Sequence, residues 1–398
     1  MNYYIKSTRI CFEDGIRPAL IEIENGKFKR ILEYETDVTT IDFKDNLCIP
    51  GLFDTHTHGY GGYPFTGSSS SEDIVELLKL YAKGGVTSVF ASSSITGYAS
   101  IVEAVKQKTA ARILGIHAEG PFLSDKRFGI AAPGTKFLKP SVEVTKELIE
   151  KSEGLLKVMT IAPENPGAIE VMQYLKNHGI KVAAGHTDAT AEEFRQSISY
   201  YDVVTHLGNA MSGIHHREMG VLGAALLSDL PCELIADGLH ISKDMLEIMF
   251  KLKPLSQFIL ISDSIPLSGI PVGPYQLDYS KVTVQEDGYL INEFGHLTGS
   301  SKTVLSGIKT IYELFHFPLH EIVATASIQP ARLYGFDQEI GSIATGKLAD
   351  FIIVDDSFEV IETYLGGASV YSNQDDQTKS NPRLSEIITE KGFMNFYK

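Results

Sequence analysis

The hydrophobic pattern of the chain changes at Pro50. Residues 1–48 alternate apolar and polar positions in short runs, which are separated by Gly15 and by Asn25-Gly26. Asn-Gly between two alternating runs is a strong hairpin signal, because these residues accept the positive φ angles that a tight turn needs. The N-terminal stretch is therefore predicted to form a small unit of β-strands.

From Pro50 onward, apolar runs of strand length alternate with amphipathic stretches. Eight such runs can be counted, and they end near His58, Ser92, Glu119, Pro163, His186, His206, Asp237 and Asp263. Nearly continuous apolar strands that alternate with helices indicate a parallel sheet covered by helices. Eight strand-helix units predict an α/β fold of the (β/α)8 TIM-like barrel type.

The stretches between these strands have the periodicity of helices. Examples are residues 72–83, 167–178, 191–199 and 243–251. Several of them follow a side chain that can cap a helix N-terminus, namely Ser71, Thr190 and Ser242.

The chain returns to β character after the eighth strand. Residues 266–296 are rich in Gly and Pro and predict a hairpin insertion, and helices are expected at 301–315 and 318–327. Residues 340–355 then alternate again, and the N-terminal β unit is their simplest partner. The expected organisation is a barrel over 49–339 and a small discontinuous β-sandwich domain built from 1–48 and 340–398.

Composition and charge narrow the classes of function. The chain has 398 residues, of which 43% are hydrophobic, and its net charge is −15 without any block of like charge. A nucleic-acid partner or an anionic membrane surface is therefore not expected. The three cysteines, which are too few for a disulfide framework, and the lack of an export signal or a membrane-spanning run predict a cytoplasmic protein.

The His56-Thr57-His58 sequence after the first barrel strand is a candidate chelate. Alternate side chains of an extended backbone share a face, so the two imidazoles would point the same way and could hold one divalent ion. Asp54 is a further ligand candidate or a support for the ligands. Taken alone, such a pair is more often two partly exposed histidines than a metal site.

Four more candidates occupy the same kind of position. Active sites of (β/α)8 barrels lie at the C-terminal ends of the strands, where this sequence places Glu119, His186, His206 and Asp263 as well as His58. Each one alone could be an ordinary core or loop residue. Five metal-type side chains at one end of a barrel predict a metal site.

Seven motifs along nearly the whole chain resemble a known family. They read PGLFDTHTHG (50–59), HAEGPF (117–122), IAPE (161–164), GHTDAT (185–190), THLGNAM (205–211), ADGLH (236–240) and GSIATGKLAD (341–350). The set resembles the N-acetylglucosamine-6-phosphate deacetylases of the amidohydrolase superfamily. The resemblance implies a metal-dependent barrel with a small β-sandwich, which hydrolyses N-acetylglucosamine 6-phosphate to glucosamine 6-phosphate and acetate.

The resemblance also implies roles for individual residues. Glu119, His186 and His206 resemble the main metal ligands, and His56 and His58 resemble ligands of a second ion that only some members bind. The cofactor is one or two divalent ions, with zinc as first choice and iron or manganese as alternatives. Asp263 resembles the catalytic aspartate. Expected contacts to the amino-sugar phosphate are Asn209, Ala210, Arg217 and His240, and part of the phosphate site is lent by a neighbouring subunit, which implies a homodimer.

The chemistry of the residues agrees with these roles. Asp263 could take a proton from the attacking water and return it to the leaving amine. The phosphate needs a local cationic patch, which His215, His216, Arg217 and His240 could supply. Arg217 could instead pair with Glu218, and Lys126-Arg127 are interpreted as exposed charges and not as substrate contacts.

Departures from the family pattern lie near the substrate. Gly208 stands where an aromatic residue is usual, and Ala131 stands where a His or Gln often holds the acetamide carbonyl. Residues 262–264 and 299–303 also differ. Loss of an aromatic wall and of a carbonyl donor would alter what fits, so two alternatives stay open. One is a related amidohydrolase acting on another amide, such as N-acetylgalactosamine 6-phosphate or an acylamino acid. The other is a non-catalytic sugar-phosphate binding protein, against which the joint presence of Glu119, His186, His206 and Asp263 argues.

Overall fold

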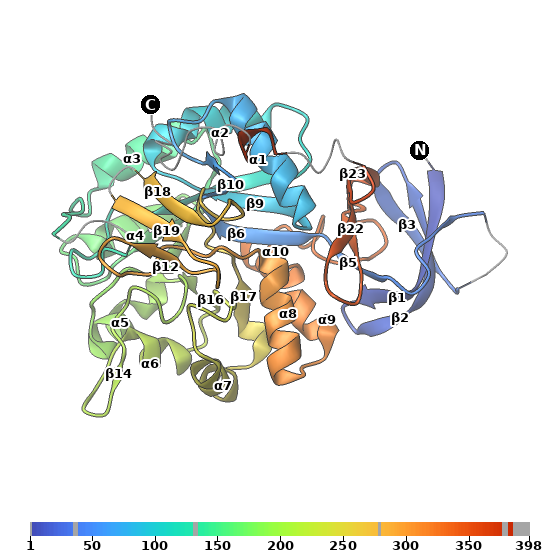
Figure 1. Cartoon of the computed structure of the whole chain (residues 1–398). Helices are drawn as coiled ribbons and strands as arrows, with labels where there is room; N and C mark the ends of the chain where they lie inside the picture. Colours follow the sequence, from blue (N-terminus) through green and yellow to red (C-terminus); the bar gives the residue numbers. More distant parts are fainter. Residues whose placement is uncertain (1, 35–38, 130–133, 278–279, 376–380, 385–398) are drawn as a thin grey trace.

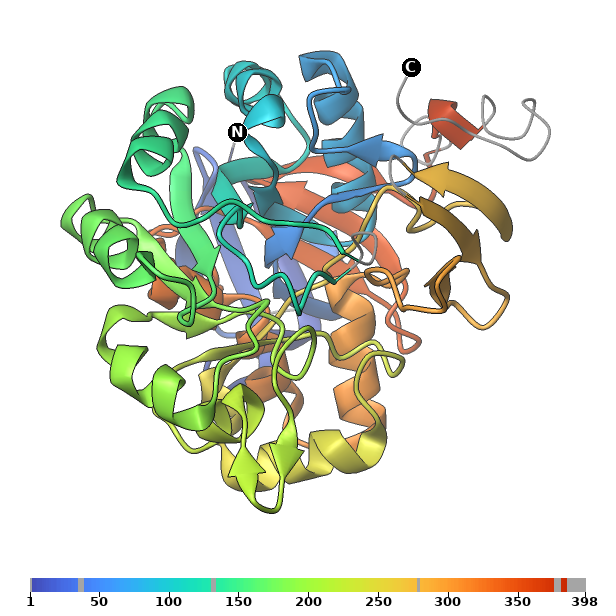
Figure 2. The ribbon, with the colours of Figure 1, turned by 90° about the vertical axis from the view of Figure 1, so that its left-hand side faces the viewer.

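Eight parallel strands form the central sheet of the protein (Figures 1 and 2). The computed structural model describes residues 2–34, 39–129, 134–277, 280–375 and 381–384. The strands are β6 (Leu52–Thr57), β9 (Val86–Ser92), β10 (Arg112–Glu119), β11 (Leu156–Ile161), β12 (Lys181–Ala184), β13 (Val203–Val204), β16 (Cys232–Leu234) and β17 (Phe258–Leu260). They pair in chain order and lie in a nearly closed barrel, so the predicted TIM-like fold is confirmed.

Helices cover the outside of this barrel, because each strand is buried on both faces and needs an apolar cover. All residues of β6 and β9 are buried. The covering helices are α1 (Ser71–Lys83), α2 (Tyr98–Val105), α3 (Val142–Lys151), α4 (Ala168–Asn177), α5 (Ala191–Ser197), α6 (Val221–Leu226), α7 (Lys243–Leu252) and α8 (Val304–Phe315). Single 3-10 turns lie at η1 (Ile95–Gly97), η2 (Ile198–Tyr200) and η3 (Leu255–Gln257).

Helix caps follow the sequence with one correction. Thr190 and Ser242 accept backbone N–H groups of the first turns of α5 and α7, as predicted. The cap of α1 is Ser70 and not Ser71, because the Ser70 hydroxyl accepts the Asp73 N–H while the Asp73 carboxylate accepts the Ser70 N–H. The helices expected at 301–315 and 318–327 are α8 and α9 (Leu319–Thr325), and α10 (Ile328–Tyr334) is a further helix that the sequence did not predict.

A second sheet unites the two ends of the chain. Its strands are β1 (Asn2–Phe12), β2 (Gly15–Glu24), β3 (Lys27–Leu32), β4 (Ile41–Asp42), β5 (Leu47–Pro50), β21 (Phe351–Val354), β22 (Val360–Leu365) and β23 (Ala368–Ser372). Antiparallel pairing of β21 with β5 joins the termini, as predicted, and Asn25 and Gly26 adopt the positive φ angles of the predicted hairpin. The domain bounds drawn from the sequence, 1–48 with 340–398 and 49–339, stay a prediction.

Three smaller β units decorate the barrel. The predicted insertion folds as β18 (Gly273–Leu277), β19 (Ser280–Val284) and β20 (Leu290–Asn292) over its own apolar cluster. A short hairpin, β7 (Gly59–Tyr60) with β8 (Tyr63–Pro64), follows the His56-Thr57-His58 sequence. A third hairpin, β14 (Ile214–His215) with β15 (Glu218–Met219), projects away from the body of the molecule (Figure 1).

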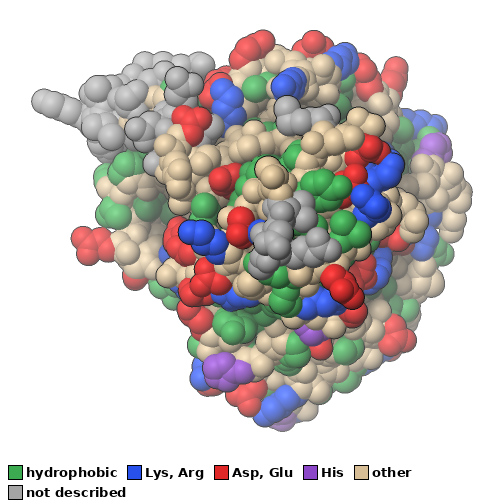
Figure 3. All heavy atoms as spheres, turned by 90° about the vertical axis from the view of Figure 1, so that its right-hand side faces the viewer, with side chains coloured by type: hydrophobic (Ala, Val, Ile, Leu, Met, Phe, Trp, Pro, Cys, Tyr) green, Lys and Arg blue, Asp and Glu red, His purple; other side chains and the backbone are tan. Residues whose placement is uncertain are grey.

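Charges of both signs are interspersed on the face that carries the terminal sheet (Figure 3). No helix in the described ranges has both the length and the apolar character to cross a membrane.

Candidate metal centre

The predicted ligands converge at the C-terminal ends of the barrel strands. His56 lies near the end of β6, Glu119 is the last residue of β10, and His186 and His206 follow β12 and β13 by two residues. Asp263 follows β17. Parallel strands end at one rim of a barrel, which is why residues far apart in sequence meet there.

Glu119, His186 and His206 form one compact group. Glu119 Oε1 lies 3.0 Å from His186 Nε2 and 2.9 Å from His206 Nε2, and the two Nε2 atoms are 3.1 Å apart. Ligands placed about 2.1 Å from a tetrahedral ion are about 3.4 Å from one another. The group therefore has nearly the spacing of a ligand set.

His56, His58 and Asp263 form an adjacent group. Asp263 Oδ1 lies 3.4 Å from His58 Nε2 and 3.7 Å from His56 Nε2. Glu119 connects the two groups, because its Oε2 is 3.1 Å from His58 Nε2 while its Oε1 faces His186 and His206. The arrangement can hold two ions that share the Glu119 carboxylate.

Ring orientation tests whether these residues suit a cation. His186 Nδ1 lies 2.7 Å from the Arg127 carbonyl oxygen, which can only accept, so Nδ1 carries a proton and Nε2 is the nitrogen that would bind an ion. Nε2 faces the Glu119 carboxylate, so a positive charge is favoured between them, either a proton on Nε2 or a bound ion. Imidazole nitrogens and carboxylate oxygens that converge in this way are a donor set typical of a divalent transition metal.

Electrostatics favour a cation at this place. Burial alone would lower the pKa of His58, but the carboxylates of Asp263 and Glu119 outweigh it and raise that pKa to about 9. Burial alone would raise the pKa of Glu119, but His56 and His186 outweigh it and hold the pKa well below its usual range. The raised His58 pKa reports a negative potential that would also stabilise a bound cation, and the lowered Glu119 pKa keeps that carboxylate ionised, so that it contributes to this potential.

Strained backbone marks the same rim. His186, His206, Ala210 and Asp263 have φ angles of 46°, 27°, 46° and 49°, and they are four of nine non-glycine residues with positive φ in the described chain. Each such conformation costs of order 1–3 kcal/mol and persists only where its surroundings impose it. Three of these four residues are the proposed ligands His186 and His206 and the proposed base Asp263, so the strain coincides with the candidate site.

Buried hydrogen bonds hold Asp263 against the histidines. Asp54 accepts the backbone N–H groups of His56 and Ser262 and the Ser262 hydroxyl, which ties β6 to the end of β17. Burial raises the pKa of Asp54 to about 7 despite these bonds. The Ser300 N–H donates to the Asp263 carbonyl over 3.0 Å. Ser262 and Ser300, which lie within the departures at residues 262–264 and 299–303, thus help to hold Asp263 in place.

A cavity of about 390 Å³ opens over the two ligand groups. Asn209, Ala210 and His240 line it, as the sequence predicts. His240 Nδ1 donates to Asp237 over 2.7 Å, which fixes the ring that faces the cavity. The volume of the cavity falls within the range of small-molecule binding sites.

Arg217 does not reach this cavity. It lies in the turn of the exposed β14–β15 hairpin, and its guanidinium donates to His216 Nε2 over 2.8 Å. His215 is exposed on the same hairpin. The predicted cationic patch is therefore divided, with His240 in the cavity and the other three residues outside it.

Sequence reasoning missed several residues of the cavity wall. Lys126 and Arg127 line it, although they also pair with Asp188 at 3.0 and 2.7 Å. Phe128 and His296 line it as well, with ring centroids 6.0 Å apart. Only the position of Lys126–Phe128 shortly after the Glu119 motif could have indicated this. His296 comes from the loop after the β18–β20 insertion and carries no such signal.

The structure describes only one of the two departures from the family pattern near the substrate, Gly208 and Ala131. A Cβ at Gly208 would lie 3.0 Å from Ile241 Cδ1 and 3.3 Å from Met249 Cε, in an apolar core, and Gly208 does not line the cavity. The expectation that Gly208 removes an aromatic wall from the substrate site is therefore not supported by its geometry. Ala131 lies outside the described residues.

Gly129 packs on the His186 ring, and this contact yields a prediction. A Cβ at Gly129 would lie 2.6 Å from His186 Cε1. Gly129→Ala should displace the ring and weaken metal binding by about tenfold to a hundredfold, as other losses of ligand support do. Metal titration of the apo-protein measures this effect.

Gly134→Ala is the matched control for this variant. Gly134 also has positive φ, but nothing lies within 4 Å of its Cβ position. If both variants bound metal equally weakly, backbone strain and not the His186 contact would be the cause.

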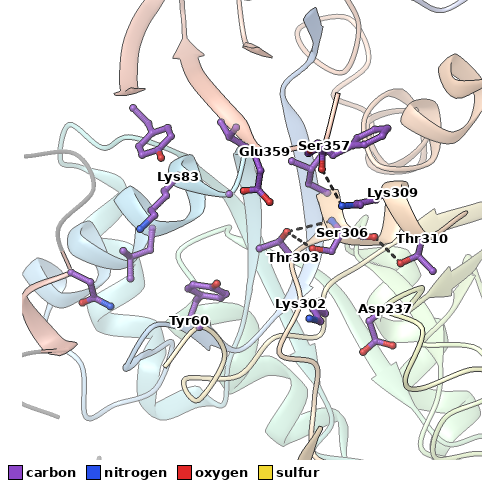
Figure 4. Close-up of a pocket in the computed structure, with 18 of the residues that line it drawn as sticks. Tyr60, Lys83, Asp237, Lys302, Thr303, Ser306, Lys309, Thr310, Ser357 and Glu359 are labelled. Atoms are coloured by element: carbon purple, nitrogen blue, oxygen red, sulfur yellow. Dashed lines mark hydrogen bonds between the residues drawn. The ribbon is translucent and has the colours of Figure 1, made fainter. Parts of the chain in front are cut away.

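A larger cavity lies elsewhere. It has a volume of about 640 Å³ and lies among α1, α8 and β22 (Figure 4). Lys83, Lys302 and Lys309 line it together with Asp237 and Glu359, and no histidine does. Its charges are mixed and it lacks a ligand group among the described residues, so the smaller cavity is the functional candidate.

Comparisons with known proteins show the family to which the chain belongs. The amidohydrolase family model matches residues 47–370. The chain is 35% identical over 352 residues to the N-acetylglucosamine-6-phosphate deacetylase of Bacillus subtilis (strain 168), covering 84% of this chain and 87% of that protein. The N-acetylgalactosamine-6-phosphate deacetylase of Escherichia coli O157:H7 is 29% identical over 380 residues, covering 92% and 99%. The crystal structure of N-acetylglucosamine-6-phosphate deacetylase from Pasteurella multocida superposes with a TM-score of 0.87 at 25% identity, covering 94% and 100%.

A barrel with these ligand groups and this match defines the chain as a member of the amidohydrolase family. Within that family it belongs with the N-acetylglucosamine-6-phosphate deacetylases, as the sequence motifs predicted.

Proposed function

We propose that the protein hydrolyses the acetamide of N-acetylglucosamine 6-phosphate, giving glucosamine 6-phosphate and acetate. One observation carries the proposal: Glu119, His186, His206, His56, His58 and Asp263 converge beneath a single cavity in a chain whose relatives are deacetylases. The non-catalytic alternative is disfavoured, because the proposed ligands and the proposed base occur together.

The metal centre would hold one or two divalent ions. Glu119, His186 and His206 would bind one, and His56, His58 and Asp263 would bind the other together with Glu119. A divalent ion supplies Lewis acidity, which polarises the amide carbonyl and makes water a better nucleophile. Zinc is our first candidate because it prefers these ligands, with iron and manganese as alternatives.

Asp263 would move the proton. Burial would raise the pKa of Asp263, but the hydrogen bond from His58 and the charge of His56 outweigh it and lower that pKa, so the group is a carboxylate at neutral pH. It would accept a proton from the attacking water as the water oxygen bonds to the carbonyl carbon. It would then give that proton to the amide nitrogen as the C–N bond breaks, which leaves acetate and an amine.

The rest of the cavity would hold the sugar phosphate. Asn209, Ala210 and His240 line it beside the ligand groups. Arg217 is proposed to complete the phosphate site of a neighbouring subunit in a homodimer, because its hairpin projects from its own chain.

We place the reaction in the cytoplasm, since Cys11, Cys48 and Cys232 are free thiols, which a reducing compartment preserves.

Mixed dimers test the proposed role of Arg217. Arg217→Ala should raise KM for the phosphorylated substrate by about tenfold to a hundredfold, the worth of a charge-assisted contact, with little change in kcat. Coexpressed Arg217→Ala and Asp263→Asn subunits should recover activity, because one site of the mixed dimer then has both residues. If mixing restored nothing, a contribution from the neighbouring subunit would be excluded.

A substrate panel decides between the open alternatives. The metal-loaded protein is expected to release acetate fastest from N-acetylglucosamine 6-phosphate. N-acetylgalactosamine 6-phosphate is the second candidate, since a relative of that name aligns over 92% of this chain. Higher kcat/KM for this C4 epimer, or for an acylamino acid, would replace the proposed substrate.

A further inference from the structure

Glu233 is a buried carboxylate that the proposed reaction does not use. It is the middle residue of β16, its exposed fraction is 0%, and its Oε2 lies 3.1 Å from His56 Nδ1. We infer that Glu233 is a positioning residue that holds His56 for the ion shared by His56, His58 and Asp263. The inference rests on the proposed metal centre and concerns the strength of its second ion site.

The contact fixes which nitrogen of His56 can bind metal. A carboxylate oxygen accepts hydrogen bonds, so His56 Nδ1 carries the proton and donates it to Glu233. Nε2 is then left with a lone pair, and it lies 3.4 Å from Glu119 and 3.7 Å from Asp263. Rotation of the ring would break the Glu233 contact, so the contact keeps Nε2 directed at the ligand group.

The surroundings of Glu233 leave one of its two carboxylate oxygens, Oε1, without a hydrogen bond among the described residues. The nearby His117 ring, whose centroid is 4.3 Å from that of His56, contacts Thr160 through Nε2, and its buried Nδ1 makes no hydrogen bond to Glu233 or to any other described residue. A buried carboxylate in this state destabilises the protein unless a positive charge lies close by.

A metal ion on the far side of His56 supplies that charge. The order carboxylate, imidazole, metal is a common arrangement, in which the carboxylate orients the ring and makes its other nitrogen a stronger ligand. Glu233 thus adds a negative charge to a centre that already contains Glu119 and Asp263. This should favour occupancy by two ions over one.

The test measures metal binding and not turnover. Zinc is titrated into the apo forms of the wild type, Glu233→Gln and Glu233→Leu, and stoichiometry and affinities are read by calorimetry and elemental analysis. Glutamine keeps an acceptor for Nδ1–H but loses the charge, whereas leucine loses both. The second ion is expected to bind about tenfold to a hundredfold more weakly in Glu233→Leu, with Glu233→Gln in between, while the first ion binds as in the wild type.

Tyr98→Phe is the matched control. The Tyr98 hydroxyl is also buried without a partner in the described chain, but Tyr98 lies on α2, which covers the outside of the barrel. This variant should bind both ions normally. Denaturant unfolding of each variant verifies that the folded state is retained, and Glu233→Gln keeps the test possible if Glu233→Leu does not fold.

Four results would overturn the inference. They are unchanged second-ion affinity in both Glu233 variants, an equal loss for both ions, a wild type that binds a single ion, and an ion located between Glu233 and His117. Acetate release by the wild type is measured separately, so failure of the inference can be distinguished from failure of the proposed function.

Discussion

Asp263→Asn is expected to lower kcat for acetate release by 10²–10⁴-fold, the usual worth of a positioned acid-base group. An amide cannot accept the proton of the attacking water, although its shape matches that of the carboxylate. The ion held by Glu119, His186 and His206 should remain, because Asp263 is not part of that group. The measurement is steady-state kinetics on N-acetylglucosamine 6-phosphate at verified metal content.

Asp244→Asn is the control for this variant. Asp244 lies in the first turn of α7 and is exposed, so the same chemical change there should leave kcat unaltered. If Asp263→Asn kept the rate of the wild type with its metal loaded, Asp263 would not be the base and another group would have to move the proton.

Glu119→Gln is expected to remove both ions and, with them, the activity. Glu119 is the carboxylate that faces both ligand groups, and an amide oxygen is a far weaker ligand for a cation. Metal catalysis contributes several kcal/mol to such reactions, so the rate should fall at least about a thousandfold. Elemental analysis and acetate release measure the two effects together.

Wild-type protein from which a chelator has removed the metal is the comparison for Glu119→Gln. Wild-type protein stripped of metal should lose its activity and regain it when the ion is added back, whereas Glu119→Gln should not recover. Full activity of the stripped wild type would contradict a metal-dependent reaction.

The architecture was predictable because barrel strands have a simple signature. Strands such as β9 are buried on both faces, so their apolar runs are continuous and countable, and the ends of these runs already located Glu119, His186, His206 and Asp263. Pairing of the two termini followed from matching β patterns at both ends. Short elements, such as α10, depend on tertiary packing and left no clear pattern.

The sequence did not reveal residues whose role depends on the direction in which the side chain points, because the hydrophobic pattern does not show that direction. Glu233 stands in the run Cys-Glu-Leu-Ile-Ala, where a polar residue could face solvent as easily as the barrel interior. Nothing local indicates that it meets His56, which is 177 positions away. Gly208 shows the converse: a motif departure suggested a change in the substrate site, whereas its missing Cβ would point into the core.

The proposed role of Arg217 depends on a second subunit. Arg217 lines neither the cavity over the ligand groups nor the larger cavity of its own subunit, so its proposed role needs a second copy. The mixed-dimer experiment addresses this point, and the ligand groups do not depend on it.

Anomalous diffraction from metal-loaded crystals tests the central claim most directly, since the absorption edge locates each bound ion. The structure predicts one peak among Glu119, His186 and His206 and a second among His56, His58 and Asp263, with Glu119 touching both. Ions bound only at other places, with these side chains left without metal at saturating concentration, would contradict the account.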